Sequence, residues 1–451
     1  MDSKNRLLQY FRENEEFMKE RINSGIELNR KGYANILLTD EEGRPLKGAK
    51  VKIKLKNHEF KHGANLFMLD EFENDEKNQK YKEYFSDTFN LATLPFFWRD
   101  LEPVKGKPRY AKDSPKIYRR PAPDLCLAYC EEHGIEPKGH CLVYIYHNPE
   151  WIEKDIHKAK IQIDRHIKEL AERYEQRIPK WEVVNETIRG AGWLDKAPID
   201  IAPDLIEWSF EEARKYFPGN ELIINEASGV WKDLLYNRSH YYLLIERALR
   251  NGAKIDTIGM QYHMFYRPEE LMNFTRTYYN PRMLYAVMDE YEKLGLQLQV
   301  TEVTIPAYGD MPDDEELQAE IIKNLYSIWF SHKAMNGIVY WNLVDGYCYT
   351  GKPTTDTIGK MNEGENFWRG GLIRHDMTPK PAYKVIHDLF HKEWHTEGEF
   401  ISNEAGKVNF KGFYGEYELE IMYNGRSVKE KLEFLKGGTT QFEIKLKEHC
   451  I

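Results

Sequence analysis

The sequence predicts an α/β fold: a (β/α)8 TIM barrel with a small all-β sandwich built from N- and C-terminal segments. Two observations lead to this prediction. Between residues 61 and 396, strand-like runs alternate with amphipathic helix-like runs, as parallel strands joined by crossover helices require. In segments 31–60 and 397–451 the apolar residues recur at every second position instead. We therefore expect an N-terminal helix over 1–30, the first part of the sandwich over 31–60, the barrel over 61–396 and the second part of the sandwich over 397–451.

Composition and charge exclude several classes of protein. The 451 residues carry 64 Lys and Arg against 73 Asp and Glu, a net charge of −9, and no basic block stands out, so we expect no nucleic-acid partner. The N-terminus is charged and no run of about 18 apolar residues occurs, so we expect a cytoplasmic protein with no membrane partner. Five cysteines without regular spacing indicate no disulfide framework. The sequence leaves the oligomeric state open.

The two ends of the chain supply the expected sandwich. Residues 4–23 form an amphipathic pattern typical of a helix, and strands are predicted at 34–39 and 51–56 around a turn. Two strands alone are marginal in water, so this hairpin needs partners. Alternating runs near the C-terminus offer them, at 407–413, 417–423, 428–434 and 441–447.

The middle of the chain supplies eight candidate barrel strands. They are residues 62–67, 89–94, 139–145, 180–186, 222–227, 257–263, 297–304 and 337–343. Amphipathic helices are predicted between them, for example at 155–173, 203–216 and 314–331. In this numbering of strands, Glu186 ends strand 4 and Glu302 ends strand 7. Both side chains then belong to the carboxyl-terminal mouth of the barrel, where catalytic groups collect.

Hydrolysis of a glycosidic bond usually requires two carboxyl groups, and two strand ends here each supply one. Asn185, next to Glu186, could bind a sugar 2-hydroxyl group, and His263 at the end of strand 6 could donate to Glu302 and hold it ionised. On the residues alone, two structural carboxylates remain an equal alternative.

Five segments resemble motifs of glycoside hydrolase family 10, the family best known for endo-β-1,4-xylanases. The motifs are W-D-V-V-N-E around the acid/base, T-E-L-D around the nucleophile, G-x-Q-x-H, G-H-x-L-V and P-K-P-A-Y. Residues 181–186 match the first with Glu182 in place of Asp, and the first two positions of 301–304 match the second. Residues 259–263, 139–143 and 379–383 match the others. The five occur in the family's order.

The resemblance implies a retaining β-glycoside hydrolase with Glu186 as acid/base and Glu302 as nucleophile, acting on an oligo- or polysaccharide without a cofactor. It also implies that Asn185, Gln261 and His263 contact the −1 sugar or the nucleophile, as does Trp341 at the end of strand 8. The histidines show no metal-ligand spacing, so no metal site is expected.

Other residues have two interpretations. Trp341 is either a sugar platform or a core aromatic, and the resemblance favours the platform. Trp368, after the long loop that follows strand 8, either binds substrate or packs a lid. Asn225 and Glu226 either support the acid/base or serve structure, and His140 is expected near the core.

The departures from the family pattern concern the glycone side of the site. After strand 2 the family has T-x-E-N-x-M-K-W, whose Glu, Asn and Lys line the −2 and −1 subsites, whereas residues 93–98 read T-L-P-F-F-W. In strand 3 the family's G-H-x-L-V-W-H continues here with Tyr144 and Ile145 in place of Trp and His. We count Trp98, Tyr144 and His147 among the substrate-binding candidates. Poor activity on long unsubstituted xylan follows as an expectation.

The sequence leaves three alternatives. One is a β-glycosidase acting on a non-xylan, decorated or aryl glycoside. Another, from a different class, is a non-catalytic carbohydrate-binding barrel, against which the retention of Glu186, Glu302 and Asn185 argues. The third is a metal-dependent barrel hydrolase, which would need His or Asp ligands at strand 1, where His62 stands alone.

Overall fold

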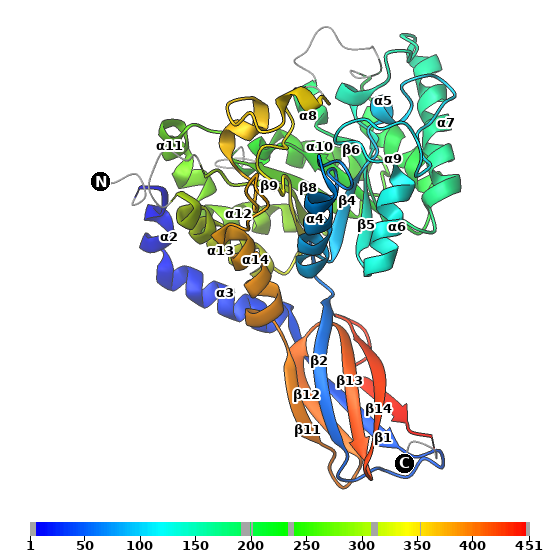
Figure 1. The fold of residues 1–451 in the computed structure, drawn as a ribbon, viewed down its shortest axis with the longest axis vertical. Helices are drawn as coiled ribbons and strands as arrows, with labels where there is room; N and C mark the ends of the chain where they lie inside the picture. Colours follow the sequence, from blue (N-terminus) through cyan, green and yellow to red (C-terminus); the bar gives the residue numbers. More distant parts are fainter. Residues whose placement is uncertain are drawn as a thin grey trace. The chain divides into compact units, whose positions relative to one another are not determined.

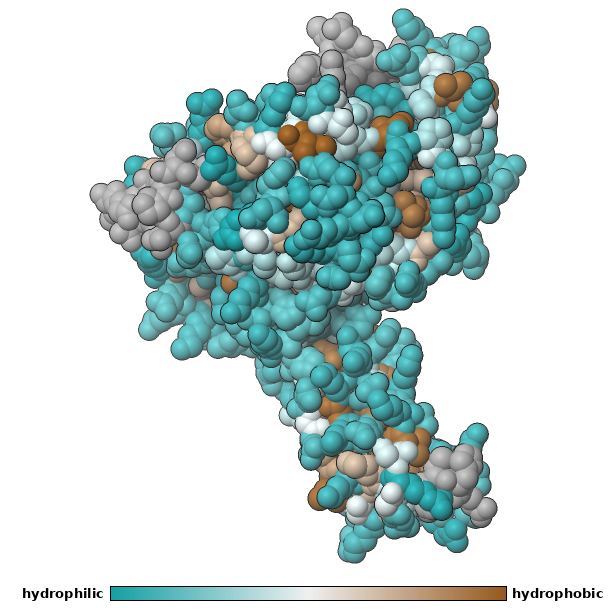
Figure 2. All heavy atoms as spheres, viewed as in Figure 1, coloured by the Kyte–Doolittle hydropathy of each residue, from teal (hydrophilic) through white to brown (hydrophobic). Residues whose placement is uncertain are grey.

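The computed structural model describes residues 6–190, 199, 202–232, 239–307, 314–351 and 353–447. The chain divides into two compact units (Figure 1). The barrel unit comprises Met1–Glu15, His62–Trp329 and Ala334–Val385, and the sandwich unit comprises Glu16–Lys61, Phe330–Lys333 and Ile386–Ile451. Figure 2 shows a largely hydrophilic face with scattered apolar residues, as is usual for a protein surface in water.

Eight strands close into a barrel in the order β10-β3-β4-β5-β6-β7-β8-β9, which confirms the predicted fold class. Pairs from β3 to β9, and β9 with β10, run parallel. The strands are β3 (Lys61–Asn65), β4 (Leu91–Pro95), β5 (Glu136–Val143), β6 (Lys180–Asn185), β7 (Glu221–Glu226), β8 (Thr257–His263), β9 (Gln297–Thr304) and β10 (Met335–Tyr340).

Helices follow the strands around the barrel. They are α4 (Asp75–Thr88), α5 (Trp98–Leu101), α6 (Pro123–His133), α7 (Ile156–Tyr174), α8 (Thr187–Gly190), α9 (Leu205–Tyr216), α10 (His240–Arg250), α11 (Pro268–Tyr278), α12 (Pro281–Glu292), α13 (Asp314–Ser331) and α14 (Pro381–Asp388). Helix α7 begins where the side chain of Asp155 accepts from the backbone N–H of Lys158, and its inner face buries Ile163, Ile167 and Leu170. Across the described residues, no helix combines the length and the apolar content needed to cross a bilayer.

Strand β5 is displaced from its predicted position. It starts at Glu136 and ends at Val143, and the next residues, Ile145–His147, form the 3-10 turn η1. The register between β5 and β6 shifts between His140 and Val143, so the chain leaves the sheet early. Tyr144 caps the start of this turn and His147 ends it.

The sandwich unit contains two sheets, each with one N-terminal strand between C-terminal strands. One has the order β12-β1-β15 and the other β11-β2-β13-β14. The strands are β1 (Lys31–Thr39), β2 (Lys50–His58), β11 (Glu397–Ile401), β12 (Lys407–Phe413), β13 (Gly415–Tyr423), β14 (Arg426–Phe434) and β15 (Gln441–Lys445). The buried side chain of Ile53 lies opposite Leu419 in the neighbouring strand. Burial of this alternating apolar face holds the two ends of the chain together.

Two elements differ from the prediction. The N-terminal helix is interrupted, with α2 over Gln9–Glu13 and α3 over Glu15–Asn29. At the break, the Asn14 side-chain amide donates to the carbonyl of Tyr10 at 2.8 Å and competes with the helical pattern. Strand β11 was not predicted, because Glu397 and Glu399 alternate with only half-buried neighbours.

Candidate active site

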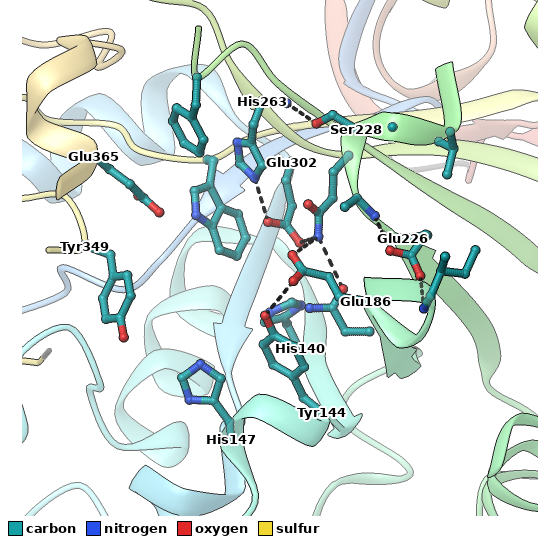
Figure 3. A pocket seen from close by; sticks show the side chains of 18 of the residues that line it. His140, Tyr144, His147, Glu186, Glu226, Ser228, His263, Glu302, Tyr349 and Glu365 are labelled. Atoms are coloured by element: carbon teal, nitrogen blue, oxygen red, sulfur yellow. Dashed lines mark hydrogen bonds and ion pairs between the residues drawn. The ribbon is translucent and has the colours of Figure 1, made fainter. Parts of the chain in front are cut away.

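The ends of the barrel strands surround a cavity of about 730 Å³. Glu186 follows β6 directly and Glu302 lies near the end of β9, so both predicted carboxyl groups line it (Figure 3). Glu186 has φ of 52°, a left-handed conformation that is uncommon for a residue with a side chain. Its backbone N–H donates to the carbonyl of Asn225 on the next strand at 3.1 Å. Local backbone strain of this kind is often found at functional sites.

The side chain of Gln261 joins the two carboxyl groups. Its Nε2 donates to Oε1 of Glu186 at 3.0 Å and to Oε1 of Glu302 at 3.1 Å, so these two oxygens lie within about 6 Å of each other. Gln261 is fully buried on β8, which pairs with β9, the strand that carries Glu302. The motif predicted on this strand therefore places an amide midway between the two carboxyl groups.

Glu302 is held by three hydrogen-bonding neighbours. Besides Gln261, Nδ2 of Asn225 donates to its Oε1 at 3.1 Å, and Nε2 of His263 lies 3.0 Å from its Oε2. Asn225 also donates to Oδ1 of Asn185 at 2.9 Å. A Cβ atom at position 259 would lie 2.6 Å from Oδ1 of Asn225, so Gly259 gives this amide the space it occupies.

Burial raises the pKa of Glu302 to about 8, and the nearby carboxyl groups of Glu182 and Glu186 add to the shift, while His140 and Lys138 oppose it. The donors around Glu302 favour its ionised form. The negative charges of the neighbouring carboxyl groups thus act in the same direction as burial and favour the protonated form of Glu302.

Glu186 has a different environment. The hydroxyl of Tyr144 donates to its Oε2 at 3.0 Å, and Gln261 occupies its other oxygen. Burial and the nearby carboxyl groups raise the pKa of Tyr144 well above its ordinary value, so this hydroxyl keeps its proton. In Figure 3 Tyr144 points at Glu186 from the side of η1.

A charged layer lies beneath the carboxyl pair. Lys138 and Glu182 are completely buried, with Nζ 2.5 Å from Oε1, and Nδ1 of His140 lies 2.5 Å from Oε2 of Glu182. Burial would raise the pKa of Glu182, but Lys138 and His140 lower it to about 2, so it is ionised. Ligand atoms of His140, Glu182 and Glu302 lie within 4.8 Å of one another, a spacing that could hold a cation. The Lys138 ammonium already supplies the positive charge there.

The cavity has an aromatic wall. Phe67, Phe97 and Trp341 pack together with Tyr144, at ring-centroid distances of 5.2 Å for Phe67–Trp341 and 5.7 Å for Phe67–Phe97. Phe265 stacks on His263 at 4.7 Å, and the His263 ring lies 6.0 Å from the Trp341 ring of this wall. Such faces suit the apolar sides of sugar rings.

The structure brings most of the predicted site residues together. Eight of them line the cavity: Glu186, Glu302, Asn185, Gln261, His263, Trp341, His147 and Tyr144. Trp98 does not, because its indole N–H donates to Glu102 at 2.9 Å and its ring stacks on His166 at 4.3 Å. Trp368 also lies outside the lining and packs against Phe265 and Phe367.

Sequence reasoning missed several lining residues. Phe67, Arg119, Arg120, Ser228, Tyr349 and Glu365 all border the cavity. Most belong to loops after strands, where no periodic pattern reveals the direction of a side chain. Of the residues with two interpretations, Glu226 and the buried His140 line the cavity, whereas Asn225 is buried outside the lining.

The protein has a closed parallel barrel, and at the carboxyl-terminal mouth two carboxyl groups accept hydrogen bonds from the same amide. This arrangement is typical of glycoside hydrolases. Comparison with known sequences identifies the family: the model of glycosyl hydrolase family 10 matches residues 65–389. The chain belongs to this family.

Individual relatives are distant. The anti-sigma-I factor RsgI6 of Acetivibrio thermocellus is 22% identical over 412 residues, covering 90% of this chain and 47% of that protein. A β-1,4-xylanase of Dictyoglomus thermophilum is 27% identical over 257 residues, covering 52% of this chain and 68% of that protein. This chain thus spans about half the length of the first relative. Xylanase 10B of Thermotoga petrophila, solved in complex with xylobiose, has the same barrel, with a TM-score of 0.59, 22% identity, and coverage of 74% of this chain and 95% of that one.

Proposed function

We propose that this protein is a retaining β-glycoside hydrolase that cleaves β-1,4-xylosidic or related β-glycosidic bonds by double displacement. The observation that carries the proposal is the Gln261 amide, which bonds both Glu186 and Glu302. It keeps their nearest oxygens within about 6 Å, short of the roughly 6.5–9.5 Å that an inverting enzyme needs for a water molecule. Relatives named as xylanases, and a xylobiose-bound structural neighbour, support a xylan-type substrate.

In the first step, the ionised carboxylate of Glu302 attacks the anomeric carbon from one face of the sugar. The protonated carboxyl of Glu186 gives its proton to the departing glycosidic oxygen. The bond from the anomeric carbon to that oxygen breaks, and an ester forms between Glu302 and the sugar. The donors from Asn225, Gln261 and His263 orient Glu302 for this attack.

In the second step, Glu186 is ionised and takes a proton from a water molecule. The resulting hydroxide attacks the anomeric carbon, and the ester bond to Glu302 breaks. Two inversions restore the original β-configuration. Asn185 lines the cavity and accepts a hydrogen bond from Asn225, and we expect it to bind the sugar 2-hydroxyl, a contact that strengthens in the transition state.

The substrate within this class is expected to differ from plain xylan. Phe97 lines the cavity and belongs to the segment 93–98, where the family pattern has polar groups, and Ile145 is buried outside the cavity lining. Each buried hydroxyl left without a partner costs about 1–3 kcal/mol. We therefore propose higher activity on short, decorated or aryl β-glycosides than on the long unsubstituted polymer.

Two measurements test the proposal. Proton NMR of the first product of an aryl β-xyloside should show the β-anomer before mutarotation, and a first-formed α-anomer would refute retention. A 2-deoxy-2-fluoro xylobioside should label Glu302, detected by mass spectrometry of the peptide. The absence of both labelling and hydrolysis across a panel of β-glycosides would favour the alternative of a non-catalytic carbohydrate-binding barrel.

A further inference from the structure

The cavity contains two buried arginines, Arg119 and Arg120, here called the arginine pair. They are 3% and 5% exposed and both line the cavity. Cζ of Arg120 lies 4.1 Å from the centroid of the Phe97 ring, and Cζ of Arg119 lies 5.9 Å from that of Phe67. The pair therefore belongs to the same wall as the aromatic cluster, close to where the sugar on the glycone side would bind.

The charges of the arginine pair are only partly balanced. Nε of Arg120 donates to Asp100 at 2.8 Å, and Asp100 is also 3.4 Å from Nε of Arg99. Arg119 makes no ion pair with a described carboxylate: its guanidinium donates to the carbonyl of Tyr347 and, at 3.1 Å, to Oδ1 of Asn342. Its Nε, buried, has no hydrogen-bond partner among the described residues.

A buried guanidinium cannot lose its proton to relieve this imbalance, because arginine stays charged in proteins. Leaving such a charge without a counter-ion is costly. Sites that tolerate the cost are often completed by an anionic ligand, and the planar fork of arginine matches a carboxylate.

The carboxylates that line the cavity do not neutralise the remaining positive charge of the arginine pair. Glu186 and Glu302 form the catalytic pair, and Glu226 lies across the cavity, where it accepts from the backbone N–H of Ile188 at 2.9 Å and of Ala227 at 2.8 Å (Figure 3). Among the described lining residues, the remaining carboxylate is Glu365. It accepts from Nδ2 of Asn342 at 2.7 Å, so the Asn342 amide stands between it and Arg119.

We propose that the arginine pair binds the carboxylate of a uronic acid on the glycone side, so that the preferred substrate is an acidic β-glycoside, such as a xylo-oligosaccharide carrying a glucuronic acid substituent. The proposal rests on the proposed function. The aromatic wall would contact the sugar faces, and the arginines would replace the neutral hydroxyl contacts that residues 93–98 do not offer.

The test compares two substrates that differ only at the carboxyl group. One is xylotriose with glucuronic acid on its non-reducing xylose, and the other is the same compound with the acid reduced to the alcohol. Charge-assisted hydrogen bonds of the usual strength predict a preference of roughly 10- to 100-fold in kcat/KM for the acidic substrate. A ratio near one, or a preference for the reduced form, would overturn the proposal.

A substitution at Arg119 tests whether the preference for the acidic substrate arises at the arginine pair. In Arg119→Gln the preference for the acidic substrate should fall at least several-fold toward one. Because the ratio is taken within one protein, a general loss of activity does not change it. The matched control is Arg250→Gln, on the exposed end of α10 outside the cavity lining, which should keep the wild-type ratio.

Binding to Glu302→Gln separates this inference from the proposed function. Calorimetry should show that this inactive variant binds the acidic oligosaccharide at least ten-fold more tightly than the reduced one, with a preference that weakens in high salt. If neither compound is hydrolysed by the wild type but this difference in binding persists, the proposed function fails and the carboxylate site stands. If the acidic and the reduced oligosaccharide are hydrolysed equally and bound equally, the proposed function stands and the carboxylate site is refuted.

Discussion

The hydroxyl of Tyr144 donates a hydrogen bond of 3.0 Å to Oε2 of Glu186, from a position where the family pattern has Trp. The residue that departs from the pattern thus contacts the carboxyl group that we propose as the acid/base. Gln261 holds the other oxygen of Glu186, so the carboxyl group has a defined orientation before substrate enters. The loss of one donor should therefore affect catalysis more than folding.

We expect Tyr144→Phe to lower kcat/KM by roughly 3- to 10-fold, the usual range for a hydrogen bond between neutral groups. The reason is that Glu186 loses its donor and gains freedom to rotate. Steady-state kinetics on an oligosaccharide measures the effect. Tyr146→Phe, the same change two residues away and outside the cavity lining, is the control and should stay within about two-fold. Equal effects in the two variants would mean that the Tyr144 hydrogen bond has no catalytic role.

The acid/base role predicts a leaving-group effect. Glu186→Ala should retain much of the first step with a dinitrophenyl glycoside, whose departure needs little proton donation, and lose most activity on oligosaccharides. Added azide should restore turnover and give a β-glycosyl azide, because the small anion enters where the carboxylate was. Uniform loss on both substrates, with no azide product, would assign Glu186 another role.

The pKa of Glu302, raised to about 8 from an ordinary 4.5, predicts a pH dependence. The proposed mechanism requires Glu302 to be ionised. We therefore expect kcat/KM to rise with pH, with the midpoint of this rise well above pH 4.5. The folded state prefers the protonated carboxyl, so its contribution to stability is present below pH 4.5 and is lost as pH rises toward 8. Kinetic profiles and urea midpoints over this range measure both effects.

Glu302→Gln provides the control for the pH effect on stability. Its amide cannot ionise, so this variant should lack that part of the decline in stability between pH 5 and 8 that Glu302 causes. Two results together would show that the pKa of Glu302 is not raised. The first is a rise of kcat/KM with a midpoint at or below pH 4.5, and the second is an identical pH dependence of stability in wild type and variant.

The sandwich unit offers a stability test. Ile53→Ala removes a fully buried side chain that lies opposite Leu419 and should lower the free energy of unfolding of this unit by about 2–5 kcal/mol. Lys52→Ala, at the neighbouring exposed position of β2, should change it by less than about 0.5 kcal/mol. Chemical denaturation followed by a probe placed in the sandwich unit distinguishes the two. Similar values would contradict the assignment of Ile53 to the core.

Much of the fold could be predicted because its signals are local. The strand predicted at 297–304 has the bounds of β9, the strand at 257–263 has those of β8, and the helix at 314–331 has those of α13. Strands buried on both faces give continuous apolar runs, and amphipathic helices repeat every 3.6 residues. Where the local pattern is weak the prediction failed, as at β11, whose alternate side chains are exposed.

The sequence by itself determined that Glu186 and Glu302 stand at strand ends, because the strand pattern stops at those residues and the closure of a barrel brings strand ends to one mouth. Only the tertiary structure decided which loop residues join them. Trp98 looked suitable for a sugar but turns away to stack on His166, whereas Arg119 and Arg120, which carry no sequence signal, line the cavity. The direction of a loop side chain depends on contacts with residues distant in the sequence, and no local pattern records those contacts.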